Sequence, residues 1–364
     1  MRELKNILDI IVKYTLSEDK TFLKEDFEVA KVLIANAKRE IALFKKGNEC
    51  KKIEKVLDTK SLSNRAFINS YGIHHRDFDE MSFSIGGHPT ATILPILLAF
   101  HKSNNVNLFL QAIKLEIVLG QILNPELYRS QYHSTTVIGI LGSAAISAKL
   151  LKLTPEQAIN ALSIAFSFLS GIKSSFGSSA KSLQVAHATQ QGLLAALYSR
   201  QGFTANVDLL GRNNVLYLFT GKRINLRYVN ELWGKLSCHL SLKDEFLIKK
   251  YDVCGSFHSI ITTALGDRDK FLQSINNIKK VIILIHPERI KYKTISFPKN
   301  SAQKKFCPVY LYAYVFLGNN PLTISDFDSV PESVKVFMKK ISLIADRRIE
   351  KWGCKTKIIK GVKV

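Results

Sequence analysis

One lysine among small residues is the feature of this sequence that most favours chemistry. Lys181 lies in the run GSSAKSLQVAHA over residues 177–188, between two segments whose apolar residues recur at helical spacing. Burying an ammonium group costs free energy unless an anion or a hydrogen-bonding partner meets it. The run therefore predicts a small-residue loop between two helices, with its lysine directed at a charged ligand.

Histidines, an aspartate and a second lysine extend this chemistry. The candidates are Asp77, His88, His133, Lys181, Lys249 and His258. Lysine neutralises a carboxylate as a compact point charge, and histidine donates hydrogen bonds or moves protons near neutral pH. A carboxylate can orient a histidine or act as a general base. Dehydration beside a carboxylate, decarboxylation and epimerisation all need a cation and a positioned acid or base.

We expect Asp77, His88 and Lys181 to take part in catalysis. We expect a second set, which shares one member with the first, to bind the substrate: His133, Lys181, Lys249 and His258. This scheme needs no metal, and His74 and His75 stand near Asp77 without the spacing of a metal site.

Several candidates also have a purely structural interpretation. Asp77 belongs to a short acidic run that could be a solvated turn, and His258 could cap a helix. His88 stands before a proline and could mark a helix start. Because Lys250 is adjacent to Lys249, the substrate-binding lysine of this segment could be either of the two.

Composition excludes several classes of protein. With 364 residues and 46% apolar content, the chain can bury a large core and is expected to form two domains. Five scattered cysteines without a C-x-x-C pair argue against a disulfide framework and favour a reducing cytoplasm. The first twenty residues are charged throughout, so neither export nor membrane spanning is predicted. Nucleotide-binding, zinc-protease and serine-hydrolase motifs are absent from the sequence.

The net charge of +22 is concentrated near the C-terminus. Residues 211–364 carry 28 basic and 12 acidic side chains and so hold +16 of that total. A polyanion-binding surface is one interpretation, and a lysine-rich solvated face is the one we favour, because no nucleic-acid-binding signature accompanies the charge. The excess could still steer small anions toward a site.

The chain divides into two regions that differ in predicted secondary structure. Helical spacing predicts helices near residues 4–15, 24–46, 90–102, 107–122, 134–151, 155–169 and 187–201. Beyond about residue 243 we predict strands at 280–285, 341–345 and 355–364, a helix at 331–340, and exposed loops at 265–271 and 286–304. The expected architecture is a large all-α helical domain over residues 1–242 and a smaller α+β domain over residues 243–364.

Five short blocks occur in a fixed order along the chain. They are DFDE at 77–80 with GHPT at 87–90, YHSTT at 132–136, the Lys181 run, KKYDVCGSFH at 249–258, and KFCP at 305–308. Together they resemble the MmgE/PrpD family, whose members include 2-methylcitrate dehydratase, cis-aconitate decarboxylase and iminodisuccinate epimerase. The resemblance is best over residues 67–264.

The resemblance implies a helical domain, an α+β lid, an active site in the cleft between them, and a homodimer. It also implies a cofactor-free lyase or isomerase acting on a small di- or tricarboxylate. Family chains are usually longer and return from the lid to the first domain by C-terminal helices, which this chain is expected to lack. Met81 stands where dehydratases and decarboxylases of the family tend to have threonine, and Asp252 replaces a common proline.

These departures keep two other functions open. A shortened, non-catalytic relative could survive as a carboxylate-binding or structural dimer. A basic scaffold could bind nucleic acid through residues 211–364, although we expect this less.

Overall fold

The computed structural model divides the chain into two compact units. The first unit, here called the helical unit, comprises Met1–Lys173 and Ala180–Ile248. The second, the α+β unit, comprises Ser174–Ser179 and Lys249–Val364. The structure describes residues 7–18, 22–206, 215–221, 227, 229–231, 233–234, 241–290, 295–324, 326 and 328–361. The expected fold class, a large helical region with a smaller α+β region, is confirmed.

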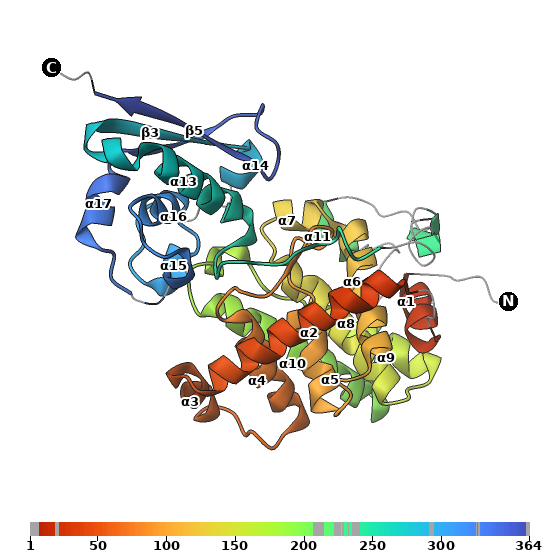
Figure 1. The fold of residues 1–364 in the computed structure, drawn as a ribbon. Helices are drawn as coiled ribbons and strands as arrows, with labels where there is room; N and C mark the ends of the chain where they lie inside the picture. The colour runs from red at the N-terminus through yellow and green to blue at the C-terminus, as the bar shows by residue number, and fades with distance from the viewer. Residues whose placement is uncertain are drawn as a thin grey trace. The chain divides into compact units, whose positions relative to one another are not determined.

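Among the described residues, the helical unit consists mainly of helices (Figure 1). In chain order they are α1 (Ile7–Leu16), α2 (Lys24–Lys45), α3 (Asn48–Glu54), α4 (Leu62–His74), α5 (Thr90–Ala99), α6 (Val106–Leu123), α7 (Glu126–Arg129), α8 (Ser134–Leu150), α9 (Pro155–Ser167), α10 (Ala180–Arg200) and α11 (Val215–Thr220). Two short antiparallel strands, β1 (Met81–Ser82) and β2 (Phe246–Leu247), pair within this unit.

Helix α8 lies at the centre of the helical unit. Every residue from Ser134 to Ala148 is buried, and a helix that is buried on all sides belongs in a core. It packs against α10, α9, α5 and α6. Small residues allow this close contact: a Cβ added to Gly192 of α10 would lie 2.6 Å from the carbonyl oxygen of Ile140 on α8.

Local signals predicted several helices correctly. At the start of α9, the Thr154 hydroxyl accepts a hydrogen bond from the Gln157 amide, and the Gln157 side chain accepts one from the Thr154 amide. This capping box satisfies two amides that the helix itself leaves without partners. Helices α2 and α8 also begin at the predicted residues.

The predicted loop around Lys181 was wrong. Helix α10 begins at Ala180, seven residues before the predicted start, so Lys181 lies in its first turn. Serine and glycine before the lysine weakened the local helical signal, whereas packing of α10 across α8 and α4 stabilises the additional turns. Helix α4, which was not predicted, supplies part of that surface.

Helix α6 is long and apolar enough to cross a membrane by length and composition, with one such helix found among the described residues. However, 83% of its most apolar window is buried inside the structure. A buried polar side chain on this helix also has a hydrogen-bond partner within the protein: Glu116 accepts a hydrogen bond from the Thr92 hydroxyl at 2.8 Å. This helix therefore acts as a core helix of the unit.

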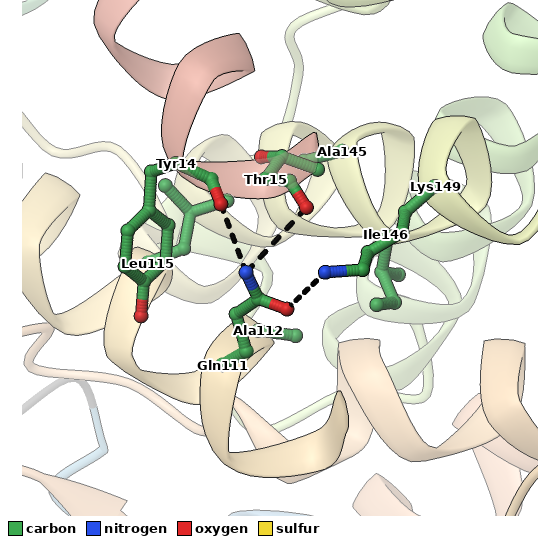
Figure 2. Close-up of a pocket in the computed structure, with 8 residues that line it drawn as sticks. All are labelled: Tyr14, Thr15, Gln111, Ala112, Leu115, Ala145, Ile146 and Lys149. Carbon is green, nitrogen blue, oxygen red and sulfur yellow. Dashed lines mark hydrogen bonds between the residues drawn. The ribbon is translucent and has the colours of Figure 1, made fainter. Parts of the chain in front are cut away.

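A small pocket among α1, α6 and α8 is a structural junction (Figure 2). The Gln111 side chain donates hydrogen bonds to the Tyr14 and Ser17 carbonyl oxygens at 2.8 and 2.9 Å. Lys149 donates to the Gln111 side-chain oxygen at 2.5 Å and to the Ser17 carbonyl oxygen at 2.6 Å. Carbonyls at a helix end need such partners, so these side chains terminate α1.

The α+β unit packs helices against one face of a three-stranded sheet (Figure 1). Its elements are α13 (His258–Phe271), β3 (Ile278–Ile285), α14 (Pro287–Ile290), α15 (Ser301–Lys304), α16 (Pro308–Phe316), α17 (Glu332–Met338), β4 (Ile341–Ala345) and β5 (Cys354–Lys360), with short 3-10 segments at Gly255–Phe257, Leu272–Asn277 and Pro321–Thr323. The sheet order is β4-β3-β5, with β4 parallel and β5 antiparallel to β3.

Alternation along β3 decides which face of the sheet is covered. Val281, Ile283 and Ile285 are fully buried, whereas Lys280 is exposed. Residues two apart share one face of a strand, so these three side chains face the helices. The predicted strands at 280–285 and 341–345 are confirmed, whereas residues 265–271, predicted as a loop, belong to α13.

Candidate active site

Four predicted site residues meet inside the helical unit. Lys181 donates a hydrogen bond from Nζ to Oδ1 of Asp77 at 3.0 Å, and Nε2 of His88 lies 3.9 Å from the same oxygen. His133 lies near them across the ring of His74, with ring centroids 5.9 Å apart. All five side chains are buried. The end of α4, the turn after it, the loop before α5, the residue preceding α8 and the first turn of α10 therefore form one cluster.

His74 and Asp79 belong to this cluster, although we assigned them no role from the sequence. Nδ1 of His74 lies 2.6 Å from Oδ2 of Asp79, and Nε2 lies 2.7 Å from Nζ of Lys181. His74 is the last residue of α4. The signal that was available is the histidine pair directly before the acidic run, but its meaning depends on α4, which the sequence did not predict.

Small polar contacts hold α4 against its neighbours and so aim His74 at Lys181. Ser70 donates to the Ala91 carbonyl oxygen at 2.7 Å and shares a 3.0 Å hydrogen bond with Thr189 of α10. Ser182, next to Lys181, donates to the carbonyl oxygen of His74 at 3.4 Å. The lysine and the histidine are thus fixed by the same helix crossing.

Asp77 lies in the turn after α4 and has an unusual backbone conformation. Its φ is 57°, in the left-handed region that aspartate tolerates better than most residues. The Asp77 amide donates to the His74 carbonyl oxygen at 3.1 Å, which closes the turn. Strained backbone conformations of this kind persist where surrounding structure holds them, and they are frequent at functional sites.

A tight loop after β1 positions His88. The Ser82 amide donates to the Gly87 carbonyl oxygen at 2.8 Å, and the His88 amide donates to the Thr135 hydroxyl at 3.2 Å. Nδ1 of His88 lies 2.5 Å from the Glu80 carbonyl oxygen. That oxygen only accepts, so Nδ1 carries the proton and Nε2 is directed toward Asp77.

His133 precedes the first turn of α8 and is held as a neutral ring. Burial, followed by the nearby charges of Lys181 and His74, lowers its pKa well below 6.5. Nδ1 lies 3.2 Å from the side-chain oxygen of Gln184. At neutral pH this imidazole can bind a carboxylate by hydrogen bonding but contributes no positive charge of its own.

Two buried carboxyl groups lie behind the cluster. Burial, and to a lesser degree the charge of Asp79, raises the pKa of Glu80 to about 8. Burial raises the pKa of Glu116 well above its ordinary value. Glu80 accepts a hydrogen bond from the Thr90 amide at the start of α5, at 2.9 Å. Both acids are therefore expected to stay protonated at neutral pH.

We predict that Glu80→Gln removes a pH dependence of stability. The folded state keeps the Glu80 proton up to about pH 8, whereas the unfolded chain loses it near pH 4.5. Stability then falls as pH rises through this window, by up to about 1.4 kcal/mol per pH unit from this group. Urea unfolding from pH 5 to pH 8 should show a flatter stability curve for the variant. The exposed Glu28→Gln serves as control, and parallel curves for wild type and Glu80→Gln would contradict the prediction.

Lys249 and His258 lie in the α+β unit. Lys249 is buried, and the ring of His258 lies 5.5 Å from that of Tyr251. Their assignment to substrate binding remains a prediction from the sequence. The other four predicted residues, Asp77, His88, His133 and Lys181, lie in the helical unit.

One atom each of His74, Asp77, Asp79 and His88 lies within 4.8 Å of the others, a separation that a metal ion could bridge. The sequence did not predict this grouping. The Lys181 ammonium hydrogen-bonds two of the four groups, so the cluster already contains a cation beside its carboxylates. We therefore interpret it first as a proton-bearing network.

Known proteins similar to this chain agree with the resemblance found in the sequence. The family model of the MmgE/PrpD N-terminal domain matches residues 42–226. Human cis-aconitate decarboxylase is 26% identical over 282 residues, which is 72% of this chain and 56% of that protein. The mouse protein of the same name is 25% identical over 302 residues, 76% of this chain and 60% of its own length.

These matches bear on the cluster because the family model spans the helical residues that form it, from α4 through α10. The chain spans little more than half the length of the two decarboxylases it matches. On the extent of the family match, this chain belongs to the MmgE/PrpD family.

Proposed function

We propose that this protein is a cofactor-free lyase or isomerase that acts on a small di- or tricarboxylate. The observation that carries the proposal is the buried Lys181 ammonium, held between Asp77 and His74 and flanked by His88 and His133. A fixed cation and the neutral His133 imidazole, both buried, bind a carboxylate more strongly than they would in water.

The same groups can supply acid–base chemistry. In our proposal Lys181 and His133 hold a substrate carboxylate. Lys181 and His88 are also the two groups that exchange a proton with the substrate, His88 through Nε2. Asp77, 3.9 Å from that nitrogen, orients His88 or shares its proton. Positioned proton transfer of this kind typically contributes about 10²–10⁴-fold to a rate. Lys249 and His258 are retained as proposed substrate contacts.

Three reactions fit these roles: decarboxylation, dehydration and epimerisation next to a carboxylate. The name shared by both relatives favours testing cis-aconitate first. Met81, buried in β1, offers no hydroxyl at a position where the sequence resemblance led us to expect one, so 2-methylcitrate and iminodisuccinate belong in the same screen.

Further proposals accompany this one. We propose a homodimer located in the cytoplasm, following the sequence resemblance and the cysteine pattern. The second candidate function is a non-catalytic carboxylate-binding relative, which predicts ligand binding without turnover. Binding of nucleic acid is the least favoured and predicts affinity that falls steeply with salt.

The test combines turnover and binding on the intact chain. We expect one of cis-aconitate, 2-methylcitrate or iminodisuccinate to be converted, with product identified by NMR spectroscopy. The same acid should raise the melting temperature, since a ligand at about a hundred times its dissociation constant stabilises a fold by about 2.7 kcal/mol. His133→Asn should weaken both effects, whereas Lys52→Ala, exposed on α3, should not.

Activity should survive prolonged chelation, because Lys181 supplies the positive charge of the cluster. Loss of turnover on chelation, restored by a divalent metal, would overturn the cofactor-free proposal. Binding without turnover of any acid would favour the non-catalytic relative, and neither binding nor turnover would exclude both.

A further inference from the structure

Three buried side chains form a line that ends on the proposed catalytic lysine. Oδ2 of Asp79 lies 2.6 Å from Nδ1 of His74, and Nε2 of His74 lies 2.7 Å from Nζ of Lys181. Exposed fractions are 3%, 0% and 5% for Asp79, His74 and Lys181. Short hydrogen bonds between ionisable groups are strong in such surroundings because little water competes for them.

The donor and acceptor roles along this line follow from elementary chemistry. An ionised carboxylate only accepts hydrogen bonds, so the Nδ1 atom facing Asp79 carries the proton. Nε2 of the neutral ring is then left with a lone pair, and an ammonium group only donates. Lys181 therefore donates to Nε2, which agrees with the 2.7 Å separation.

We propose that Asp79 and His74 are positioning residues for Lys181, with Asp79 fixing the His74 tautomer that accepts the lysine proton. This inference rests on the proposed function and deepens it. The arrangement follows the logic of a carboxylate that orients a histidine, which in turn activates a third group. Here the activated group is an amine.

The proton balance of this relay is simple. A proton moves from Nζ of Lys181 to Nε2 of His74, which leaves a neutral amine and an imidazolium stabilised by the Asp79 carboxylate. The lone pair on Nζ then takes a proton from the substrate carbon, and the electron pair of the broken C–H bond stays on the substrate. In the last step Nζ gives a proton to a later intermediate and takes the Nε2 proton of His74 in its place. This leaves an ammonium group and a neutral imidazole, as at the start.

Asp77 holds the other side of the ammonium group. Its Oδ1 accepts a hydrogen bond from Nζ at 3.0 Å, so Lys181 is fixed from two directions. The adjacent ring of His88 lies 4.7 Å from that of His74, and His133 lies on a further side at 5.9 Å. His74 is the residue that links Lys181 to Asp79, through hydrogen bonds at both of its ring nitrogens.

The first test does not depend on turnover. Two-bond ¹⁵N–¹H correlation spectra of protein labelled at the histidine nitrogens report the tautomer, with His74 assigned by the loss of its signals in His74→Gln. We expect wild-type His74 to carry its proton on Nδ1, and Asp79→Asn to shift population toward the Nε2 proton. A wild-type proton on Nε2, or no change in Asp79→Asn, overturns the proposal and leaves the proposed function standing.

The second test separates proton relay from simple support. In His74→Gln the side-chain oxygen can still accept a hydrogen bond from Lys181 but cannot take its proton. We expect kcat to fall by about 10²–10³-fold in His74→Gln and Asp79→Asn, with KM changed less than about fivefold.

His75→Gln is the matched control. His75 is the neighbouring histidine. Its Nδ1 contacts the Gly72 carbonyl oxygen at 2.9 Å, and its ring packs against those of Phe44 and Tyr71. Its kcat should stay within about twofold of wild type. Wild-type kcat in His74→Gln, or equal losses in His74→Gln and His75→Gln, would reject the relay. Absence of turnover in the wild type would reject the proposed function, and the tautomer experiment would then decide the inference alone.

Discussion

Lys181→Met should destabilise the protein by about 3–5 kcal/mol at neutral pH and abolish turnover. Methionine fills a similar volume but removes the cation that hydrogen-bonds Asp77 and His74. The Asp77 carboxylate is then left buried without its ion-pair partner, and breaking such pairs costs far more than losing a surface contact. Chemical denaturation measures the first effect, and single-turnover assays measure the second.

A double-mutant cycle tests this explanation. Asp77→Asn on the Lys181→Met background removes the uncompensated charge and should recover most of the lost stability, without recovering activity. Lys52→Met, whose lysine is 75% exposed, should change stability by less than about 0.5 kcal/mol. If the double variant is as unstable as the sum of the single ones, the two groups are not coupled and our view of the cluster is wrong.

Gly192→Val should destabilise the protein by about 3 kcal/mol, the upper end of the usual cost of overpacking, and reduce turnover together with stability. A Cβ at this position would lie 2.6 Å from the Ile140 carbonyl oxygen, 2.6 Å from Cβ of Ser143 and 2.9 Å from the Ala144 amide nitrogen. Two of these three atoms belong to the backbone of α8 and cannot rotate away. Helix α10 must then move off α8, and overpacking of this kind is costly.

Lys181 lies three turns away on the same helix, so the displacement should also disturb its hydrogen bonds. Gly266→Ala is the matched control, because Gly266 also lies inside a helix, yet a Cβ added there would meet no described neighbour within 4 Å. Its stability should stay equal or rise by about 0.5–1 kcal/mol, since alanine is the better helix former. Unchanged melting of Gly192→Val would show that the two helices can separate without cost.

Much of the helical fold was predictable from local signals. Thr154 and Gln157 marked the start of α9, and apolar spacing located α2, α6 and α8 to within a few residues. Alternation and β-branched residues located β3 and β4. These features depend on interactions between residues close in sequence, so the sequence carries them directly.

Only part of the candidate site was predictable from the sequence. Residue type and the family resemblance led to Lys181, His88, His133 and Asp77 as candidates. The sequence did not reveal that Lys181 belongs to a helix, because the turns around it depend on packing against α4 and α8. Nor did it reveal His74, since that residue gains its partners only when α4 ends beside α10.

The sequence by itself determined the helical periodicity, the two-part architecture and the family of this protein. Tertiary structure alone decided which ionisable groups share one buried cluster. The contact between His74 and Lys181 joins residues 107 positions apart, and no local pattern encodes such a distance. It arises because glycine, serine and threonine are small enough to let α10 approach α4 and α8 closely, so that their polar groups meet in a buried cluster.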